Sequence, residues 1–395
     1  MYIGYNAGMN DSIYLDHNAT TPLLPEVAEA VRDAAVRYRA NPASQHHLGQ
    51  AARRALETAR DRISELLGAK TNGMDPDRLV FTSGGTEANN LALLGMLAHL
   101  PPGHLITSAM EHSSILRPVE ELERRGWQVS RAGAEQRGIV RVDELEACFR
   151  PNTRLVCIQA ANNETGVLQP ITEISAICRR HSVPLMSDAC QLVGKLPVLF
   201  THWGLAALSC AAHKFHGPLG IGALLLRGDI AVQPRLFGGH QQAGVRPGTE
   251  SVALAVGMQV ALECWRRDAE PRTRHLAALK TRFVEQLCAG IPSAVVIGHD
   301  APRLPNTACI AFPGIDRQAF FLALDTVGIA CSTGSACASG SSEPSPTLLA
   351  MELAPEQVAS ALRFSWGATT EIAEIDEGCR RILNAYNELC RLRKC

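Results

Sequence analysis

The sequence predicts an α/β protein: a large domain with a mostly parallel sheet covered by helices, followed by a smaller α+β domain. Two observations predict this. Short runs rich in Val, Ile and Leu alternate with amphipathic stretches long enough to connect parallel strands. The texture changes near residue 266, where a charged, proline-punctuated segment precedes shorter strand-like runs. We therefore expect a large domain at 21–265 and a small domain at 266–395 that also takes in residues 1–20.

The expected elements follow in chain order. A helix is expected first, over 49–69, because apolar residues recur there at helical spacing. The strands of the large domain are expected at 78–83, 104–109, 154–160, 183–187 and 205–212, with helices at 86–100, 114–125 and 171–182. Strands of the small domain are expected at 294–298, 307–312 and 328–332.

Composition narrows the class of protein. The 395 residues are 46% hydrophobic, which is typical of a soluble protein with a sizeable core, and the formal net charge is −1. The charge balance argues against a nucleic-acid partner, which a broad basic field would attract. There is no signal-peptide pattern and no apolar stretch of membrane-spanning length, so we expect a cytoplasmic protein with no membrane partner.

Thirteen cysteines are scattered along the chain without a C-x-x-C pair or a Cys/His zinc spacing. We expect no metal site, and free thiols in a reducing compartment. Seven of them lie in apolar runs and are assigned to the core: Cys148, Cys157, Cys178, Cys210, Cys264, Cys288 and Cys309.

A polar cluster follows each expected strand of the large domain. The clusters read TSGGTEANN, MEHSS, NNETG, DACQ and HKFHG. Because the carboxyl ends of parallel strands meet at one edge of a sheet, we expect these clusters to line one crevice.

Three of these clusters hold groups of complementary chemistry. Gly85 and Thr86 join a strand to a helix, so backbone N–H groups and a hydroxyl can face a phosphate. Asp188 ends an apolar strand and needs a positive partner, such as a protonated pyridine nitrogen. Lys214 follows an apolar run, where burial favours the neutral amine that reacts with carbonyl groups. Singly, a tight turn, an N-capping aspartate and a surface lysine are the simpler interpretations.

Together, the phosphate cradle, the carboxylate and the lysine are the three anchors that pyridoxal phosphate (PLP) requires. His112 adds a flat ring that can stack on the pyridine. Gln191 and Asn163 follow neighbouring strands and can hydrogen-bond the ring oxygen or a substrate carboxylate.

The ordered blocks resemble the cysteine desulfurases of the NifS/IscS type, in the class V aminotransferase group of fold-type I PLP enzymes. The blocks include YLDHNATTP, NPASQHHLG, TSGGTEANN, NNETGVLQPI, SDACQLVGK, HKFHGPLGIGAL, GVRPGTES, STGSAC and LRFSWG, and they cover nearly the whole chain. The resemblance implies a seven-stranded type of sheet, PLP as cofactor and L-cysteine as substrate. It also implies a homodimer and a sulfur-acceptor protein, either an Fe–S scaffold or a sulfur carrier.

The resemblance also implies roles for individual residues. Catalysis would rest on Lys214, which bonds to the cofactor aldehyde, on His112, which stacks on the ring and handles protons, and on Cys337, which takes the sulfur as a persulfide. The other cofactor contacts would be Gly85, Thr86 and His213, joined by Thr249 of the partner subunit, for the phosphate, Asp188 for the ring nitrogen, Gln191 for the ring oxygen and Asn163. The substrate contacts would be Asn41, Asn163 and Arg363. The Gly, Ser and Pro content of 338–346 predicts a loop beside Cys337.

Three departures from the family pattern stand out. Ala211 occupies a position where the family often has a phosphate-binding serine, so that contact is lost or comes from Ser209 or a water. Cys331 stands where many relatives have a small residue; we expect a packing thiol, with a disulfide to Cys337 as the minor alternative. The tail after Arg363 is short, which leaves the acceptor open.

Two other functions are compatible with parts of the pattern. A selenocysteine lyase or another class V transaminase or lyase would keep Lys214, Asp188 and His112, but a transaminase does not need Cys337. A non-catalytic sulfur-carrier partner or assembly scaffold would keep the fold alone, and the intact site residues argue against it.

Overall fold

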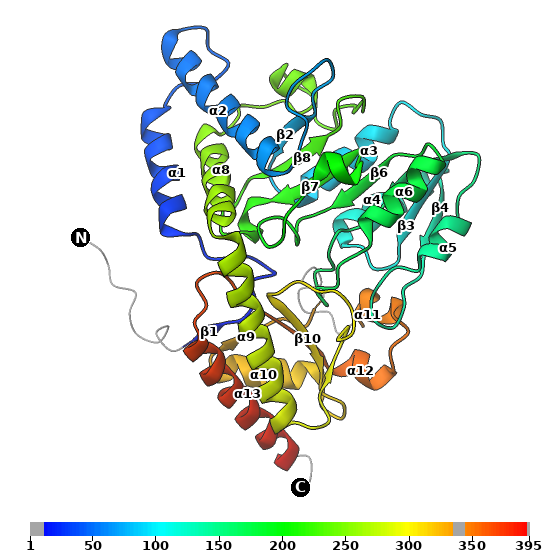
Figure 1. Ribbon diagram of the computed structural model, residues 1–395, viewed down its shortest axis with the longest axis vertical. Coiled ribbons are helices and arrows are strands. Elements are labelled where there is room, and N and C mark those ends of the chain that lie inside the picture. Colours follow the sequence, from blue (N-terminus) through cyan, green and yellow to red (C-terminus); the bar gives the residue numbers. More distant parts are fainter. Residues whose placement is uncertain (1–11, 335–343, 393–395) are drawn as a thin grey trace.

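The computed structural model describes residues 12–334 and 344–392 of the chain (Figure 1). Its centre is a seven-stranded sheet in the order β2-β8-β7-β6-β5-β3-β4. The strands are β2 (Arg78–Thr82), β3 (His104–Ser108), β4 (Gln128–Ala132), β5 (Thr153–Cys157), β6 (Leu185–Asp188), β7 (Ala207–Ala211) and β8 (Gly222–Leu226). The expected α/β class with a mostly parallel sheet is confirmed.

One strand, β8, runs against both of its neighbours, β2 and β7, while the other pairs are parallel. Because two reversals cancel, β2 points the same way as β7 and its carboxyl end lies at the same edge. The sequence missed β8 and β4. The side chains of β4 are mostly exposed or half-buried, so this strand lacks the apolar run by which the others were found.

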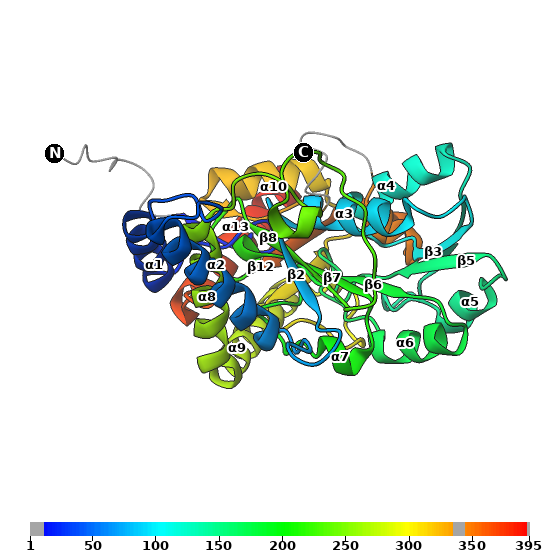
Figure 2. The ribbon, with the colours of Figure 1, turned by 90° about the horizontal axis from the view of Figure 1, so that it is seen from above.

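Helices cover both faces of this sheet (Figure 2). On one face α3 (Gly85–Leu97) and α4 (Ser113–Arg124) pack on a buried cluster that includes Leu105, Leu155 and Leu224. The larger core on the other face takes in residues of α2 (His47–Leu66), α6 (Ile171–Arg180), α7 (Phe200–Trp203) and α8 (Val252–Arg267). Both α1 (Pro25–Arg37) and α2 pack against α8. Alternate strand residues thus face two different cores, as in a three-layer α/β domain.

A second group of elements forms around two small sheets. One contains β9 (Val295–Val296), β10 (Thr307–Ala311) and β12 (Ala361–Ser365), and the other pairs β1 (Ile13–Tyr14) with β11 (Ile329–Ala330). The helices here are α9 (Ala269–Gly290), α10 (Arg317–Thr326), α13 (Ile372–Leu392) and the short α12 (Pro355–Ser360), which contacts β10. Two other short helices are α5 (Val142–Ala147), which contacts β4 of the large sheet, and α11 (Pro346–Ala350).

The amino-terminal segment belongs to the core of this second group. Ile13 and Leu15 share one buried cluster with Phe283, Phe364 and Trp366. The domain boundary at residue 266 stays a prediction. This position lies within α8, and only Asp268 separates α8 from α9.

The assignment of seven cysteines to the core is right for five of them and wrong for two. Cys148 and Cys288 are only partly buried. Cys148 caps the short helix α5, and Cys288 follows directly after Leu287, the last residue of the buried stripe of α9. Both lie beside a buried stripe and not in it.

In the described ranges, no helix is long and apolar enough to cross a membrane. No group of three or more His, Cys, Asp and Glu side chains in those ranges is placed to hold a metal ion.

Candidate active site

The five polar clusters meet in one cavity of about 210 Å³ at the carboxyl edge of the large sheet. The polar residues that follow the strands in the sequence therefore predicted the position of this cavity correctly. The cavity is lined by Asn18, Gly85, Thr86, Asn89, His112, Ser114, Gln159, Ala161, Asn163, Asp188, Cys190, Gln191, Ala211, His213, Lys214 and Arg363.

Asp188 is held in a fixed orientation at the end of β6. Its Oδ2 accepts a hydrogen bond from Asn89 Nδ2 at 2.7 Å, and its Oδ1 accepts one from the backbone N–H of Cys190 at 2.9 Å. Asn89 is itself fixed, because Nδ2 also donates to Ser114 Oγ at 2.8 Å and Oδ1 accepts from Ser209. The sequence missed Asn89, whose only signal was a polar residue in the buried stripe of an otherwise apolar helix.

Lys214 follows β7 in a single 3₁₀ turn, η1 (Ala212–Lys214). Its Nζ donates to the backbone oxygens of Asn18 at 2.7 Å and Ala19 at 2.8 Å. Burial lowers the pKa of Lys214 below its ordinary value. The neutral amine, which is the form that attacks an aldehyde, is therefore more accessible here than on an exposed lysine.

Two histidines face the cavity, His112 after the end of β3 and His213 after the end of β7. His112 caps α4, and its Nδ1 accepts from the backbone N–H of Ser114 at 3.2 Å, so a neutral ring carries its proton on Nε2. His213 precedes Lys214, and burial, helped by the charge of Lys214, lowers the pKa of His213 to about 4. His213 is therefore neutral near pH 7.

Gln191 has its amide oriented by a second lysine. Lys195 Nζ donates to Gln191 Oε1 at 2.7 Å, and Gln191 Nε2 donates to the backbone oxygen of Asn18 at 3.0 Å. Because the backbone oxygen of Asn18 only accepts, the amide nitrogen of Gln191 must face Asn18, which leaves Gln191 Oε1 toward Lys195. Burial lowers the pKa of Lys195 well below its ordinary value. The sequence missed Lys195; its signal was a charge in the apolar run QLVGKLPV.

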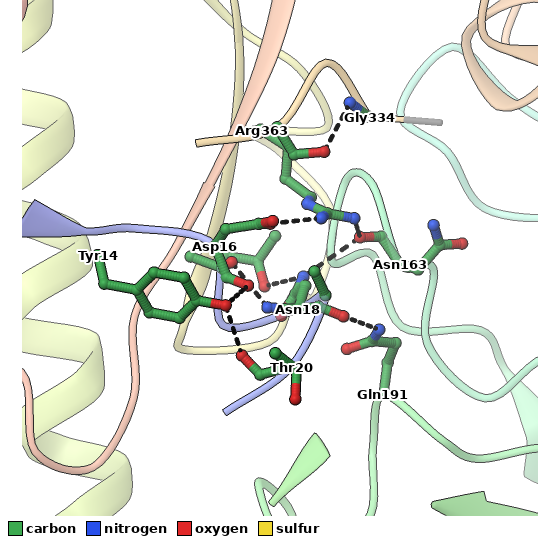
Figure 3. A network of polar contacts seen from close by, with 12 residues as sticks. Tyr14, Asp16, Asn18, Thr20, Asn163, Gln191, Gly334 and Arg363 are labelled. Carbon is green, nitrogen blue, oxygen red and sulfur yellow. Dashed lines mark hydrogen bonds and ion pairs between the residues drawn. The ribbon is translucent and has the colours of Figure 1, made fainter. Parts of the chain in front are cut away.

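Arg363 also lines the cavity, and Figure 3 shows its contacts with Asp16 and Asn163. Its side chain is 1% exposed, and its Nη2 lies 2.6 Å from Asp16 Oδ1. Its Nη1 donates to the backbone oxygen of Asn163 at 3.0 Å. Among the described residues, Arg363 Nε has no hydrogen-bond partner. Asp16 was not among the predicted residues.

Two predicted residues lie away from this cavity. Asn41 is exposed, and its Oδ1 accepts from the backbone N–H of Ala43 at 2.9 Å. Thr249 lines a separate cavity of about 200 Å³. Their proposed roles, one of which was assigned to a partner subunit, stay predictions.

The three departures noted in the sequence have different outcomes. Ala211 lines the cavity, whereas Ser209 donates its hydroxyl to Asn89 and is not among the lining residues. Cys331 is 7% exposed in the apolar cluster of the second group, and burial raises its pKa to about 12, as expected of a packing thiol. Cys337 lies outside the described residues, in 335–343.

The cavity residues fit PLP. The N-terminus of α3 and Thr86 can hold its phosphate, Asp188 its ring nitrogen and Lys214 its aldehyde. The backbone at Gly85 comes so close to its neighbour that an added Cβ would lie 2.6 Å from Cys190 Sγ. A glycine there keeps the end of the helix open to an anion.

Fold and cavity together define a class of PLP enzymes. The family model described as Aminotransferase class-V matches residues 13–377, and the chain belongs to this family, whose cofactor is PLP.

Within that family the chain belongs with the cysteine desulfurases. It is 38% identical over 364 residues to "Cysteine desulfurase IscS" of Dictyoglomus turgidum, covering 92% of this chain and 91% of the relative. A solved "NIFS-LIKE PROTEIN" superimposes with a TM-score of 0.87 at 29% identity, covering 96% of this chain and 100% of the other. The structure titled "SspA in complex with cysteine" matches with a TM-score of 0.78 at 30% identity, covering 91% and 100%.

Proposed function

We propose that this enzyme moves the sulfur of L-cysteine onto Cys337, leaving L-alanine, and then passes the sulfur to an acceptor protein. The observation that carries this proposal is where the two segments flanking Cys337 lie. The backbone of Ser332 exchanges two hydrogen bonds with Arg363, and Ser345 Oγ donates to Glu164, the neighbour of Asn163. Arg363 and Asn163 both line the cavity.

Chain geometry supports this assignment of Cys337. Cys337 is three residues beyond Gly334, and three extended residues span at most about 10 Å. Gly334 N donates to Ser332 Oγ at 3.2 Å, so the start of this span is tied to the arginine strand. We therefore expect the Cys337 thiol to come within reach of a substrate in the cavity.

Each wall of the cavity has its own task. Bound PLP supplies an electron sink that makes the substrate Cα–H acidic. Lys214 Nζ, once free of the cofactor, takes that proton, and Asp188 keeps the ring nitrogen positively charged. Arg363 donates to the substrate carboxylate, and Asn163 lies beside it.

The sulfur step uses the chain's own thiol. The Cys337 thiolate attacks the substrate sulfur, so that an S–S bond forms and the substrate C–S bond breaks. The electron pair of the broken bond stays with the substrate carbon, which takes a proton and becomes the methyl group of alanine. Cys337 is left as a persulfide.

The remaining parts of the proposal rest on the family. A homodimer would bring Thr249 of a partner subunit to this cavity, since in its own subunit Thr249 lines a different one. The acceptor would be an Fe–S scaffold or a sulfur carrier, and the location cytoplasmic.

The test is L-cysteine turnover followed by both alanine and sulfide release. We expect Cys337→Ala to keep the yellow colour of bound PLP and to lose sulfur release. Cys331→Ser is the matched control and should keep both, because a buried thiol is seldom ionised. Unchanged sulfur release from Cys337→Ala, or a keto acid as the product, would contradict the proposal, and faster turnover of L-selenocysteine would favour a lyase.

A further inference from the structure

Glu164 is a buried carboxylate that the proposed chemistry does not use. It is 5% exposed and lies in the turn NNETG, one residue after Asn163. The turn is rigid, because Asn162 Oδ1 accepts from the backbone N–H groups of Glu164 and Thr165, at 2.9 Å each.

One oxygen of this carboxylate meets both segments that flank residues 335–343. Ser345 Oγ donates to Glu164 Oε2 at 2.6 Å. From the other side, a Cβ added to Gly334 would lie 2.7 Å from the same Oε2, and Gly334 has a φ of +97°. The backbone conformation at 334 therefore favours glycine, and a larger residue there would also have to displace the Glu164 carboxylate.

The contacts continue beyond these two residues. Ser345 Oγ accepts from the backbone N–H of Leu348 at 3.2 Å and so caps α11. Gly334 is tied to Ser332, whose backbone pairs with Arg363. Glu164 thus joins the start of α11 to the strand that carries the substrate-binding arginine.

A carboxylate is an expensive group to place here. Burial raises the pKa of Glu164, and the hydrogen bond from Ser345 and the charge of Arg363 offset only part of that cost. An apolar side chain would fill the same space without the desolvation penalty. The position of Glu164 between the two flanking segments offers a reason why a carboxylate is present despite this desolvation penalty.

We propose that Glu164 is a positioning residue for sulfur transfer: it fixes Gly334 and Ser345 relative to each other and to the cavity. This inference rests on the proposed role of Cys337. Glu164 touches neither cofactor nor substrate, so its loss should slow the step that needs Cys337 and leave substrate binding intact.

The experiment separates those two steps in the PLP-loaded enzyme. L-cysteine binding is followed by the change in cofactor absorbance, and the persulfide on Cys337 is followed by mass spectrometry in a single turnover. For Glu164→Ala we expect persulfide formation to slow about tenfold, the factor that one hydrogen bond to a charged group is worth, with L-cysteine affinity within about twofold of native.

Three further variants sharpen the result. Glu164→Gln should recover part of the rate, because its amide oxygen can still accept from the Ser345 hydroxyl. Ser345→Ala should slow the same step. The double variant, with Glu164→Ala and Ser345→Ala together, should be no slower than the slower single variant, since each single change removes the same hydrogen bond. Glu111→Ala is the matched control: Glu111 is buried and accepts from Ser108 Oγ at 2.6 Å, but none of its hydrogen bonds goes to a residue flanking 335–343. It should lower the melting temperature without selectively slowing persulfide formation.

The outcomes are distinguishable. A native rate of persulfide formation in Glu164→Ala overturns the inference. So does an equal loss of binding and rate in Glu164→Ala and Glu111→Ala, which is what a merely structural role predicts. If the native enzyme forms no persulfide on Cys337, the proposed function itself fails.

Discussion

The two walls of the cavity are built in different ways. The sheet wall, made of His112, Asp188, Gln191 and Lys214, takes each residue from a position at or just after the end of a strand. The arginine wall, made of Asn18, Asn163 and Arg363 together with Asp16, the ion-pair partner of Arg363, joins positions that are far apart. Arg363 is 347 positions from Asp16 and 200 from Asn163.

The two walls differ in what determines the position of each side chain, which is the local strand end in one wall and long-range partners in the other. On the sheet wall, a strand end determines where a side chain points, so loss of one residue should remove a chemical group and leave the wall standing. On the arginine wall, each polar group is the partner of another buried group. Loss of one residue there should cost stability as well as function.

Lys214→Ala tests the sheet wall and should have the largest effect. We expect turnover of L-cysteine to fall by about 10²–10⁴-fold, the range for a lost proton-transfer group, while the fold persists. Turnover and circular dichroism measure the two effects. Lys70→Ala, at an exposed lysine, is the control. Retention of more than a tenth of native turnover by Lys214→Ala would sink the assignment of this lysine.

Asp16→Asn tests the arginine wall. It leaves the buried Arg363 guanidinium without its carboxylate, which should lower the free energy of unfolding by about 3 kcal/mol and raise the KM for L-cysteine. Urea denaturation and initial rates measure the two effects. An unchanged free energy of unfolding would show that the arginine wall tolerates the loss of a residue as well as the sheet wall does. That result would contradict the proposed difference between the two walls.

The pH dependence of stability tests two buried histidines, His17 and His216, that lie close to each other near the arginine wall. Burial lowers the pKa of His17 to about 3 and that of His216 to about 4. Between about pH 6.5 and these values the unfolded chain binds protons that the folded chain does not, so the free energy of unfolding falls as the pH falls, by at most about 1.4 kcal/mol per pH unit for each histidine.

Other groups also change the free energy of unfolding over this pH range. The contribution of His216 must therefore be measured as the difference between a variant and the native protein. Burial raises the pKa of Glu111 to about 8, which makes the free energy of unfolding fall as the pH rises through the range from about 4.5 to 8. His216→Asn leaves that contribution in place and suits the φ of 66° at this position. Urea denaturation with saturating PLP at pH 5, 5.5, 6 and 6.5 should give this variant the shallower dependence on pH. Identical slopes would contradict the assignment.

Asp376→Asn should have the smallest effect and serves as the control for Asp16→Asn. Asp376 also pairs with an arginine, Arg282, but both side chains are largely exposed. Exposed ion pairs contribute little to stability, so the urea midpoint should stay at its native value. A shift as large as that of Asp16→Asn would mean that burial is not what distinguishes the arginine wall.

The same contrast explains how much of the molecule the sequence could predict. Apolar runs and the polar residues after them predict most strands of the large sheet and every residue of the sheet wall. Asn163 was found from its place after a strand and Arg363 by resemblance. Asp16 and Asn18 were not found, because no local pattern marks a residue whose partner is hundreds of positions away. Asn89 and Lys195 were missed for a related reason: each is a polar group in an apolar stretch whose partner appears only in the folded chain.

The pairing of β1 with β11, and of Asp16 with Arg363, has a consequence for the chain as the ribosome makes it. Residues 13–16 are synthesised early and cannot meet their partners until residues 329–363 have been made. A chain that ended before Arg363 would therefore lack both the partner of Asp16 and the arginine that we expect to bind the substrate carboxylate.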